Sequence, residues 1–477
     1  MDGEIKIKPL DDNNNCKQYL IFQIMNNQNL NVTRRKFLLT AATAAIAAPL
    51  LLESCAPKTK LRHACIGVGG MMGLNDLQNF LSHPDVQIVA ICDVDENFLK
   101  KALELVPNAR TYSDWRELLK NEAENIDSVN VTVPDHNHFA ISYKAIEMGK
   151  HVYCQKPMCH DVAEVRLLTE ASVKYNVKTQ LGTQYASSQN DRRAVQLIKE
   201  GAVGKVKHVY LCSNRPGAEK YRLAGPRPVE GAEPPAYLNW DVWIGTAPLR
   251  NYVPDLYHTV MWRSWLDFGT GWSGDIGCHI FDAVWKGLGL TAPKNVIAKV
   301  QQSWQESPER QADTWAQSNH IKWTFPGNKF TESDVLPVEW FDGEFYPPKE
   351  VQDLFHGDTY PPESAMLVGT EGALLVAHGN DSVLLPHDKF KNHKIPNFNE
   401  RNHYHHFVDA CLGGENTESH FSQSGPMTEA ILLGTVAARV PDVLLEWDSA
   451  NLKITNSPEA NQLVRRNYRE GWQVAGF

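Results

Sequence analysis

The feature that most restricts the fold is a glycine-rich turn between an apolar segment and a helix-like segment. Residues 62–68 form a short apolar run, and Gly67, Gly69 and Gly73 follow the pattern G-x-G-x-x-x-G before a helical stretch that reaches about Leu81. Glycines let the backbone turn tightly and approach a phosphate, and the start of a helix favours negative charge. The segment therefore predicts the first strand, turn and helix of a dinucleotide-binding domain.

An acid at the end of the next strand supports this interpretation. Residues 86–92 are apolar, and Asp93 lies 20 residues after Gly73. A carboxylate there accepts hydrogen bonds from ribose hydroxyls and repels a 2′-phosphate, so NAD is predicted rather than NADP. The third glycine falls one residue later than the usual spacing. The predicted cofactor contacts in this part of the chain are Gly67, Gly69, Gly70, Met71, Met72 and Asp93.

The order of segments predicts two domains. Strand-like and helix-like segments alternate over residues 61–182, which predicts an α/β Rossmann domain with a parallel sheet. Long β-like segments joined by Pro- and Gly-rich loops follow, which favours an α+β substrate and oligomerisation domain at 183–477 with a large, mainly antiparallel open sheet. Two closing helices are candidates for packing back on the first domain. The expected strands and helices of the second domain are 206–213, 295–304, 314–325, 365–368, 373–377, 404–411 and 427–437.

Composition excludes several other classes of protein. The chain has 477 residues and a net charge of −9 without a basic stripe, so nucleic-acid binding is not predicted. Nine cysteines without a CxxC pair indicate neither a disulfide framework nor a structural zinc site. His403, His405 and His406 lie close together, but they lack a clear set of acid partners. We interpret them as a polar helix face and predict no metal.

Residues 1–60 are interpreted as a leader and linker. Arg34 and Arg35 precede a short apolar run at 39–52, which resembles a twin-arginine export signal. A buried helix that follows two arginines is the alternative. Cys55 ends the run where a lipoprotein cysteine would lie, but Glu53 departs from the usual small residue, so lipid anchoring is left open. We therefore expect a periplasmic or exported protein that contacts membrane only through an anchor at Cys55.

Three later segments carry a family resemblance. They are TVPDHNH at 132–138, GKHVYCQKP at 149–157 and GWSGDIGCHIFD at 271–282. In this order and spacing they resemble the glucose–fructose oxidoreductase / inositol dehydrogenase / rhizopine-catabolism (Gfo/Idh/MocA) family, over the body of the chain from about residue 61. The resemblance implies NAD, a small carbohydrate or polyol substrate, and a homo-oligomer.

The resemblance also implies roles for residues of the first domain. Pro134 and His138 would lie near the nicotinamide ribose. Lys156 corresponds to the lysine of the family's Glu-Lys-Pro motif, which reaches both the cofactor ribose and a substrate hydroxyl. Gln155 stands where that motif has Glu, which removes a negative charge beside the lysine. We expect cofactor binding to survive this change and the proton affinity of Lys156 to be affected.

A second pair of residues is predicted to act at the reacting carbon. Asp275 and His279 are four residues apart, so a helix presents both on one face, and the family uses this pair in catalysis. Oxidising an alcohol requires an acceptor for the hydroxyl proton, and imidazole suits that task near neutral pH. We predict His279 as the base, with Asp275 and Lys156 positioning the substrate.

Three further residues are candidate substrate contacts. Trp272 is the last of five tryptophans between residues 240 and 272, and aromatic faces stack on sugar rings, although tryptophans also fill cores. Gln184 and Arg192 begin the second domain, where the family often contacts substrate. A solvated helix face is the alternative for both.

Three functional hypotheses remain at this point. The first is an NAD-dependent oxidoreductase that removes a hydride from a hydroxyl of a sugar, glycoside or polyol. The second is an NAD-dependent glycosidase that uses transient oxidation at C3 and elimination. The third is a non-catalytic cofactor-binding protein, which Gln155 alone suggests and which intact Lys156, Asp275 and His279 disfavour.

Overall fold

The computed structural model describes residues 60–356 and 359–474. The predicted export signal and Cys55 lie outside these ranges. No helix within them is both long and apolar enough to cross a membrane.

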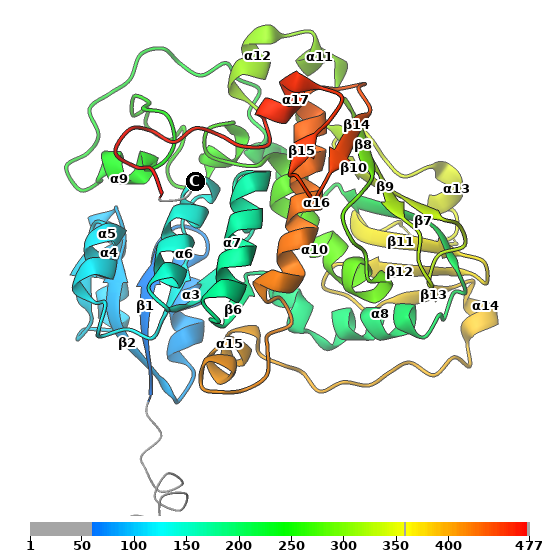
Figure 1. Ribbon diagram of the computed structural model, residues 1–477, viewed down its shortest axis with the longest axis horizontal. Coiled ribbons are helices and arrows are strands. Elements are labelled where there is room, and N and C mark those ends of the chain that lie inside the picture. Colours follow the sequence, from blue (N-terminus) through cyan, green and yellow to red (C-terminus); the bar gives the residue numbers. More distant parts are fainter. Residues whose placement is uncertain (1–59, 357–358, 475–477) are drawn as a thin grey trace, which may run out of the picture. The chain divides into compact units, whose positions relative to one another are not determined.

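The first sheet has six parallel strands in the order β3-β2-β1-β4-β5-β6, which is the strand order of a Rossmann fold (Figure 1). The predicted α/β first domain is thereby confirmed. Its strands are β1 (Leu61–Ile66), β2 (Val86–Cys92), β3 (Arg110–Tyr112), β4 (Ser128–Val131), β5 (His151–Cys154) and β6 (Thr179–Leu181). The helices between them are α3 (Gly73–Leu81), α4 (Glu96–Leu105), α5 (Trp115–Asn121), α6 (His138–Glu147) and α7 (Val162–Lys174).

Local signals at the helix starts explain why these helices begin where they do. Asp95 caps α4 by accepting a hydrogen bond from the backbone of Asn97, and Asp161 and Glu164 form a capping box at α7. Because the strands are parallel, their carboxyl ends and the loops that follow them lie at one common edge of the sheet. That edge is where ligands bind in folds of this type.

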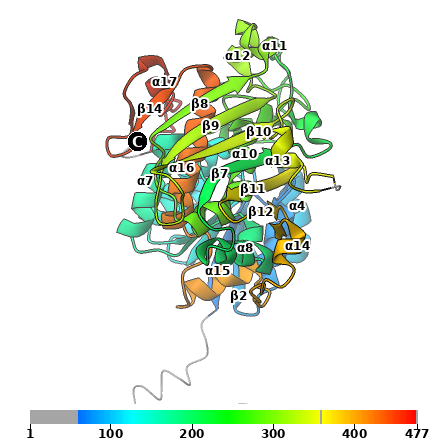
Figure 2. The ribbon, with the colours of Figure 1, turned by 90° about the vertical axis from the view of Figure 1, so that its right-hand side faces the viewer.

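The second sheet has nine strands in the order β13-β12-β11-β7-β10-β9-β8-β14-β15 (Figure 2). Among the strand pairs that the described residues form in this sheet, β7–β10 is the one parallel pair, which confirms the predicted mainly antiparallel sheet. The strands are β7 (Val206–Ser213), β8 (Asn295–Val300), β9 (Asn319–Pro326), β10 (Val335–Asp342), β11 (Glu363–Gly369), β12 (Ala373–Ala377), β13 (Val383–Leu385), β14 (Leu445–Asp448) and β15 (Lys453–Ile454).

Some boundaries of the predicted strands are wrong. The strand expected at 295–304 stops at Val300 because α11 (Gln302–Gln305) follows it, and the strand expected at 314–325 begins only at Asn319. β10 was not expected because it contains Pro337. This proline is tolerated because it pairs only with Thr324 of β9, and the pairing with β7 starts one residue later.

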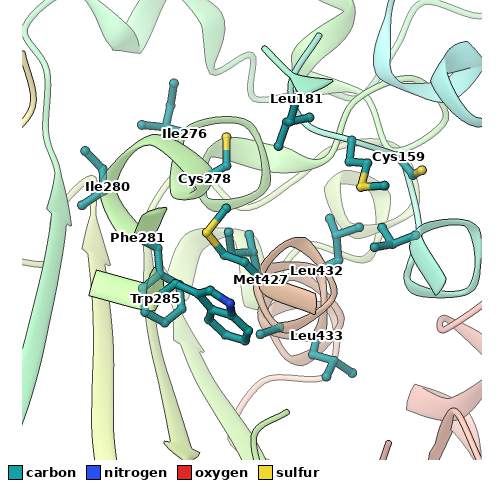
Figure 3. Packing of buried hydrophobic residues seen from close by; sticks show 14 of the residues in the cluster. Cys159, Leu181, Ile276, Cys278, Ile280, Phe281, Trp285, Met427, Leu432 and Leu433 are labelled. Atoms are coloured by element: carbon teal, nitrogen blue, oxygen red, sulfur yellow. The ribbon is translucent and has the colours of Figure 1, made fainter. Parts of the chain in front are cut away.

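Two long helices join the sheets into one core. α10 (Gly271–Leu288) and α16 (Phe421–Arg439) lie side by side, and α16 also packs against α7 of the first domain (Figure 1). Figure 3 shows Phe281 and Trp285 of α10 facing Met427 of α16, with Leu181 of β6 nearby. Full burial of each such side chain stabilises the fold by about 1.5–3 kcal/mol. This packing holds α10, which carries Asp275 and His279, in the core cluster that also contains the Rossmann strands.

The remaining helices surround the sheets. Among them α15 contacts α3, so a segment close to the C-terminus covers part of the first domain. These helices are α8 (Gln189–Lys199), α9 (Trp240–Ile244), α12 (Pro308–Asp313), α13 (Lys349–Gln352), α14 (His387–Phe390), α15 (His403–Cys411) and α17 (Pro458–Gln462).

Candidate active site

A cavity lies at the carboxyl edge of the parallel strands. Its other wall comes from the second domain and includes Trp243, His258, Trp262 and Arg263. The two tryptophans belong to the group of five between residues 240 and 272, whereas His258 and Arg263 were not predicted as site residues. Nearly all of the predicted cofactor contacts line this cavity, namely Gly67, Gly69, Gly70, Met71, Met72, Asp93, Pro134, Gln155 and Lys156.

Two glycines of the turn are required by close backbone contacts. Gly67 has φ +86°, and a Cβ there would lie 2.1 Å from the Thr132 carbonyl oxygen. A Cβ on Gly73 would lie 2.5 Å from the backbone of Val68. Gly73, the third glycine, is the first residue of α3 and lies where this helix packs against the turn.

Asp93 faces the cavity and also fastens the glycine turn. Its Oδ2 accepts hydrogen bonds from the backbone N–H groups of Val68 (2.9 Å) and Gly69 (3.0 Å), and its Oδ1 accepts one from Asp95 (3.0 Å). Burial raises the pKa of Asp93 to about 6, against the opposing effect of these N–H groups. The carboxylate can therefore change its charge within the neutral range.

His138 lies behind the cavity wall rather than in it. The ring is fully buried, with Nδ1 2.6 Å from the Pro157 carbonyl and Nε2 2.7 Å from the Val133 carbonyl. Both ring nitrogens are occupied by loop backbone, so the structure gives His138 a role in holding two loops together. His138 does not line the cavity, and its contact with the nicotinamide ribose stays a prediction.

Lys156 connects the first cavity with α10. Its Nζ lies 2.5 Å from Oδ1 of Asp275, and Arg263 Nε lies 3.4 Å from Oδ2 of the same carboxylate. Burial would raise the pKa of Asp275, but the charges of Lys156 and Arg263 outweigh it and hold this pKa below its usual value. The predicted Lys156 and Asp275 thus form an ion pair, although they are 119 residues apart.

His279 lies one helical turn after Asp275 on α10. Its Nδ1 is buried and has no hydrogen-bond partner among the described residues. Burial and the positive charge of Lys156 hold the pKa of His279 well below its usual value, so the ring is neutral at neutral pH. The ring faces His378, with ring centroids 5.1 Å apart. Sequence reasoning did not find His378, because it follows β12 almost 100 residues later in the chain.

Gln155 donates a hydrogen bond to the buried carboxylate of Asp76, which was not predicted as a site residue from the sequence. Its Nε2 lies 2.8 Å from Oδ2 of Asp76, a fully buried residue of α3. Asp76 also accepts hydrogen bonds from Tyr404 (2.7 Å) and Thr132 (2.8 Å). A carboxyl group thus contacts the amide that stands where the family motif has Glu. An acid just inside α3 was the only available sequence signal.

Asp135 is a second acid that was missed. It lines the same cavity as Lys156, and its Oδ2 accepts a hydrogen bond from Thr270 Oγ1 at 3.1 Å. Burial and the neighbouring Asp275 raise the pKa of Asp135 to about 8, so this carboxyl group is protonated at neutral pH. Its place in the TVPDHNH segment was the signal that could have identified it.

The three predicted substrate residues lie in three different places. Trp272 lines a second cavity together with Asp275, and its Nε1 donates to Ser213 Oγ at 3.0 Å. Gln184 donates weakly to the hydroxyl of Tyr153 at 3.3 Å, outside both cavities.

Arg192 lines a separate hollow between helices and pairs with Glu418 at 3.5 Å. The structure therefore brings only Trp272 to the catalytic residues and gives no support to a substrate contact at Arg192. Within the described ranges, no group of three or more His, Cys, Asp or Glu side chains is arranged to hold a metal ion.

Family models match the chain over both domains. The model of the oxidoreductase family with an NAD-binding Rossmann fold (Gfo/Idh/MocA) matches residues 61–183, and the model of the family's C-terminal alpha/beta domain matches residues 188–326. Together the matches cover more than half of the chain. They confirm the resemblance inferred from the three sequence segments.

Two curated relatives carry different activities in their names. A glycosyl hydrolase family 109 protein of Stenotrophomonas maltophilia is 33% identical over 198 residues, which cover 37% of this chain and 41% of the relative. A myo-inositol 2-dehydrogenase of Thermotoga maritima is 27% identical over 169 residues, which cover 35% of this chain and 49% of the relative. The chain thus spans less than half the length of either relative.

Solved structures share the fold. The WlbA dehydrogenase of Bordetella pertussis, crystallised with NADH and UDP-GlcNAcA, superposes with a TM-score of 0.56 at 15% identity, covering 82% of this chain and 98% of that one. The chain therefore belongs to the Gfo/Idh/MocA oxidoreductase family, with an NAD-binding Rossmann domain followed by a C-terminal α/β domain.

Proposed function

We propose that this protein uses NAD to remove a hydride from a hydroxyl-bearing carbon of a sugar, glycoside or polyol. The observation that carries the proposal is the ion pair between Lys156, which lines the cofactor cavity, and Asp275, one helical turn before His279. A residue set that spans the cofactor cavity and the second domain can hold a substrate beside the cofactor.

The residues of the cavity fit a dinucleotide. Gly70 has φ +63°, and no atom lies within 4 Å of where its Cβ would be, so the turn leaves room for a pyrophosphate at the start of α3. Asp93 lies at the strand end suited to ribose hydroxyls. When bound, NAD⁺ supplies the hydride acceptor.

The chain's own residues supply the acid–base chemistry. His279 accepts the hydroxyl proton, because its imidazole is neutral and its Nδ1 has no partner among the described residues. Lys156 donates to the same hydroxyl and is itself oriented by Asp275. Arg263 balances the second oxygen of Asp275, so the carboxylate stays ionised.

A second candidate function is glycoside hydrolysis through transient oxidation. It is favoured by the 33% identity to a glycosyl hydrolase family 109 protein. Oxidation followed by return of the hydride would need no external route to reoxidise the cofactor. That property suits a protein exported by the twin-arginine route, which remains a prediction from residues 1–60.

Product analysis distinguishes these functions. The purified protein is incubated with NAD⁺ and a panel of sugars, polyols and pyranosides. An accumulating ketone with one NADH per product supports the dehydrogenase, and a free monosaccharide without net NADH supports the hydrolase. If NAD⁺ binds but no member of the panel gives either result, the protein is a non-catalytic cofactor binder toward these substrates, and the proposal is contradicted.

A further inference from the structure

A second imidazole lies beside the proposed base. His378 follows β12, and its ring lies 5.1 Å from that of His279, centroid to centroid, with the planes inclined by 49°. The Nδ1 atoms of both rings are buried and have no hydrogen-bond partner among the described residues. By contrast, buried His403 has both ring nitrogens bonded, to Ser187 Oγ and to the Leu181 carbonyl.

A buried nitrogen without a hydrogen bond lowers the stability of the folded state, and the pair contains two such atoms. Leaving a buried polar atom without a hydrogen bond costs about 1–3 kcal/mol. Two such atoms on facing rings, supplied by α10 and by the turn after β12, are suited to bind a polar ligand that lies between or beside the rings.

The pair is close to the reacting groups and near solvent. The positive charge of Lys156 acts on both rings. The edge of the Tyr185 ring packs on His378 with centroids 4.5 Å apart, and Tyr185 is 44% exposed. Arg215, also half-exposed, pairs with Glu363 at 2.9 Å and acts on His378. The charge of Lys156 thus reaches both imidazoles, and the neighbours of His378 are partly exposed.

Two carboxylates near the pair, Asp275 and Glu363, are already held by cations. Asp275 is held by Lys156 and Arg263, and Glu363 is held by Arg215 and by Ser213 at 3.1 Å. Burial lowers the pKa of His378, which Glu363 opposes and Arg215 and Lys156 reinforce. His378 is thus a neutral group that can still accept a proton.

We propose that His378 is a second catalytic base, which removes the proton from the carbon next to the one that is oxidised. The proposal rests on the proposed function. Alcohol oxidation releases one proton and needs one base, whereas cleavage by oxidation and elimination must remove two protons from neighbouring positions. Two adjacent neutral imidazoles fit the second reaction, with a glycoside oxidised at C3 as the substrate class.

After His279 has taken the O3 proton and the hydride has left C3, the ketone acidifies the C2–H bond. His378 accepts the C2 proton, the C–H electron pair forms a C1=C2 double bond, and the C1–O bond to the aglycone breaks. The aglycone oxygen leaves with the bond pair and takes a proton from water. Addition of water to C1 and C2 and return of the hydride to C3 give a free sugar without net oxidation.

The test supplies the ketone directly, so that elimination is observed apart from oxidation. The full-length protein is given a synthetic 3-keto p-nitrophenyl glycoside without added NAD⁺. Nitrophenolate release above the protein-free rate and deuterium uptake at C2 from D₂O are measured. The variants are His378→Ala and His378→Gln, and His387→Ala, an exposed histidine of α14, is the control. NAD⁺ binding and thermal melting establish that each variant is folded.

We expect both His378 variants to lose about 10²-fold or more in nitrophenolate release and in deuterium uptake. Single-turnover hydride transfer from the parent glycoside should stay within a few-fold, and the control should match wild type. Wild-type rates in both folded His378 variants, or equal losses of elimination and hydride transfer, would overturn the assignment. So would a wild-type protein that leaves the ketone intact. A wild type that eliminates from the ketone but transfers no hydride from any sugar would instead contradict the proposed function.

Discussion

Two buried carboxylates on either side of Gln155 and Lys156 are held in opposite ways. Asp76, on the Rossmann side, accepts hydrogen bonds from uncharged donors, including Gln155 at 2.8 Å and Tyr404 at 2.7 Å. Asp275, on the side of the second domain, is paired with two cations, Lys156 and Arg263.

The difference appears in the direction of the pKa shifts. Burial outweighs the neutral donors and raises the pKa of Asp76, whereas the cations around Asp275 outweigh burial and lower its pKa. Neutral donors fix the position of a group without fixing its charge, and cations fix both. The carboxylate beside the proposed substrate position is the one whose charge is fixed.

Removing the Lys156 cation, which pairs with Asp275, should have the largest effect on the rate of hydride transfer. Lys156→Met leaves Asp275 with Arg263 alone and removes a donor to the substrate hydroxyl. We expect a loss of about 10²–10³-fold in hydride transfer, measured by stopped-flow absorbance of the reduced nicotinamide. Lys144→Met, which removes an exposed ion pair with Glu147 on α6, is the control and should change little. A fully active Lys156→Met would show that the ion pair has no part in the reaction.

Changing the hydrogen-bonded pair of Gln155 and Asp76 should have an intermediate effect, which is seen in the free energy of unfolding. Gln155→Glu places a second carboxylate against Asp76, and we expect the free energy of unfolding at neutral pH to fall by about 1–3 kcal/mol. The double variant Asp76→Asn with Gln155→Glu restores an amide and a carboxylate in contact and should recover part of that loss. Urea unfolding of the single and double variants measures the coupling. Additive losses would contradict a direct interaction.

The contrast between the two sides also marks what sequence could reveal. The glycine turn and Asp93 were predictable because strand, turn and helix are local in the chain. The pairing of Lys156 with Asp275 was predictable only through the family resemblance. Asp76 and Tyr404 are 328 residues apart, and their contact depends on how α15 packs against α3. No local pattern encodes that packing.

The same reasoning applies to His138, His378 and β10, whose positions depend on tertiary structure. His138 was placed at the cofactor because its motif matches, but whether its ring nitrogens face the cavity or the loop backbone depends on tertiary structure. His378 was missed because only the packing of β12 near α10 brings it to His279. β10 was missed because Pro337 is tolerated only at a position with one pairing neighbour.

The titration of Asp93 should have a smaller effect, which is a change of NAD⁺ affinity with pH. Its pKa of about 6 means that NAD⁺ affinity should rise a few-fold as pH increases from 5 to 7, because the ionised carboxylate is the better acceptor for ribose hydroxyls. Calorimetric titration across this range measures the change. Asp93→Asn should bind more weakly and lose the dependence. Affinity that is unchanged by this substitution would refute the ribose contact.

Asp93 affects the stability of the fold in the opposite direction to NAD⁺ affinity as pH rises. The pKa of Asp93 in the folded chain lies above the unfolded value of about 3.9, so the folded state binds the proton more tightly. The contribution of Asp93 to the free energy of unfolding is therefore present at low pH and lost as pH rises toward 6. Comparison of thermal melting of wild type and Asp93→Asn at pH 4.5 and 7 isolates this contribution.

Arg192 should give the smallest effect. It pairs with Glu418 in a hollow that contains none of the proposed catalytic residues. Arg192→Ala should therefore leave KM for the sugar within about two-fold, since the site is remote from the reaction. Steady-state kinetics on the best substrate of the panel tests this. A ten-fold rise in KM would restore the substrate contact that the sequence suggested.

The most direct test of the central claim is single-turnover hydride transfer in wild type and His279→Ala, with NAD⁺ affinity measured on the same samples. We predict that the reduced-nicotinamide band forms in wild type on addition of the preferred sugar. In His279→Ala its rate should fall by about 10²–10⁴-fold while NAD⁺ affinity stays within a few-fold. A near-normal rate in His279→Ala would contradict the account.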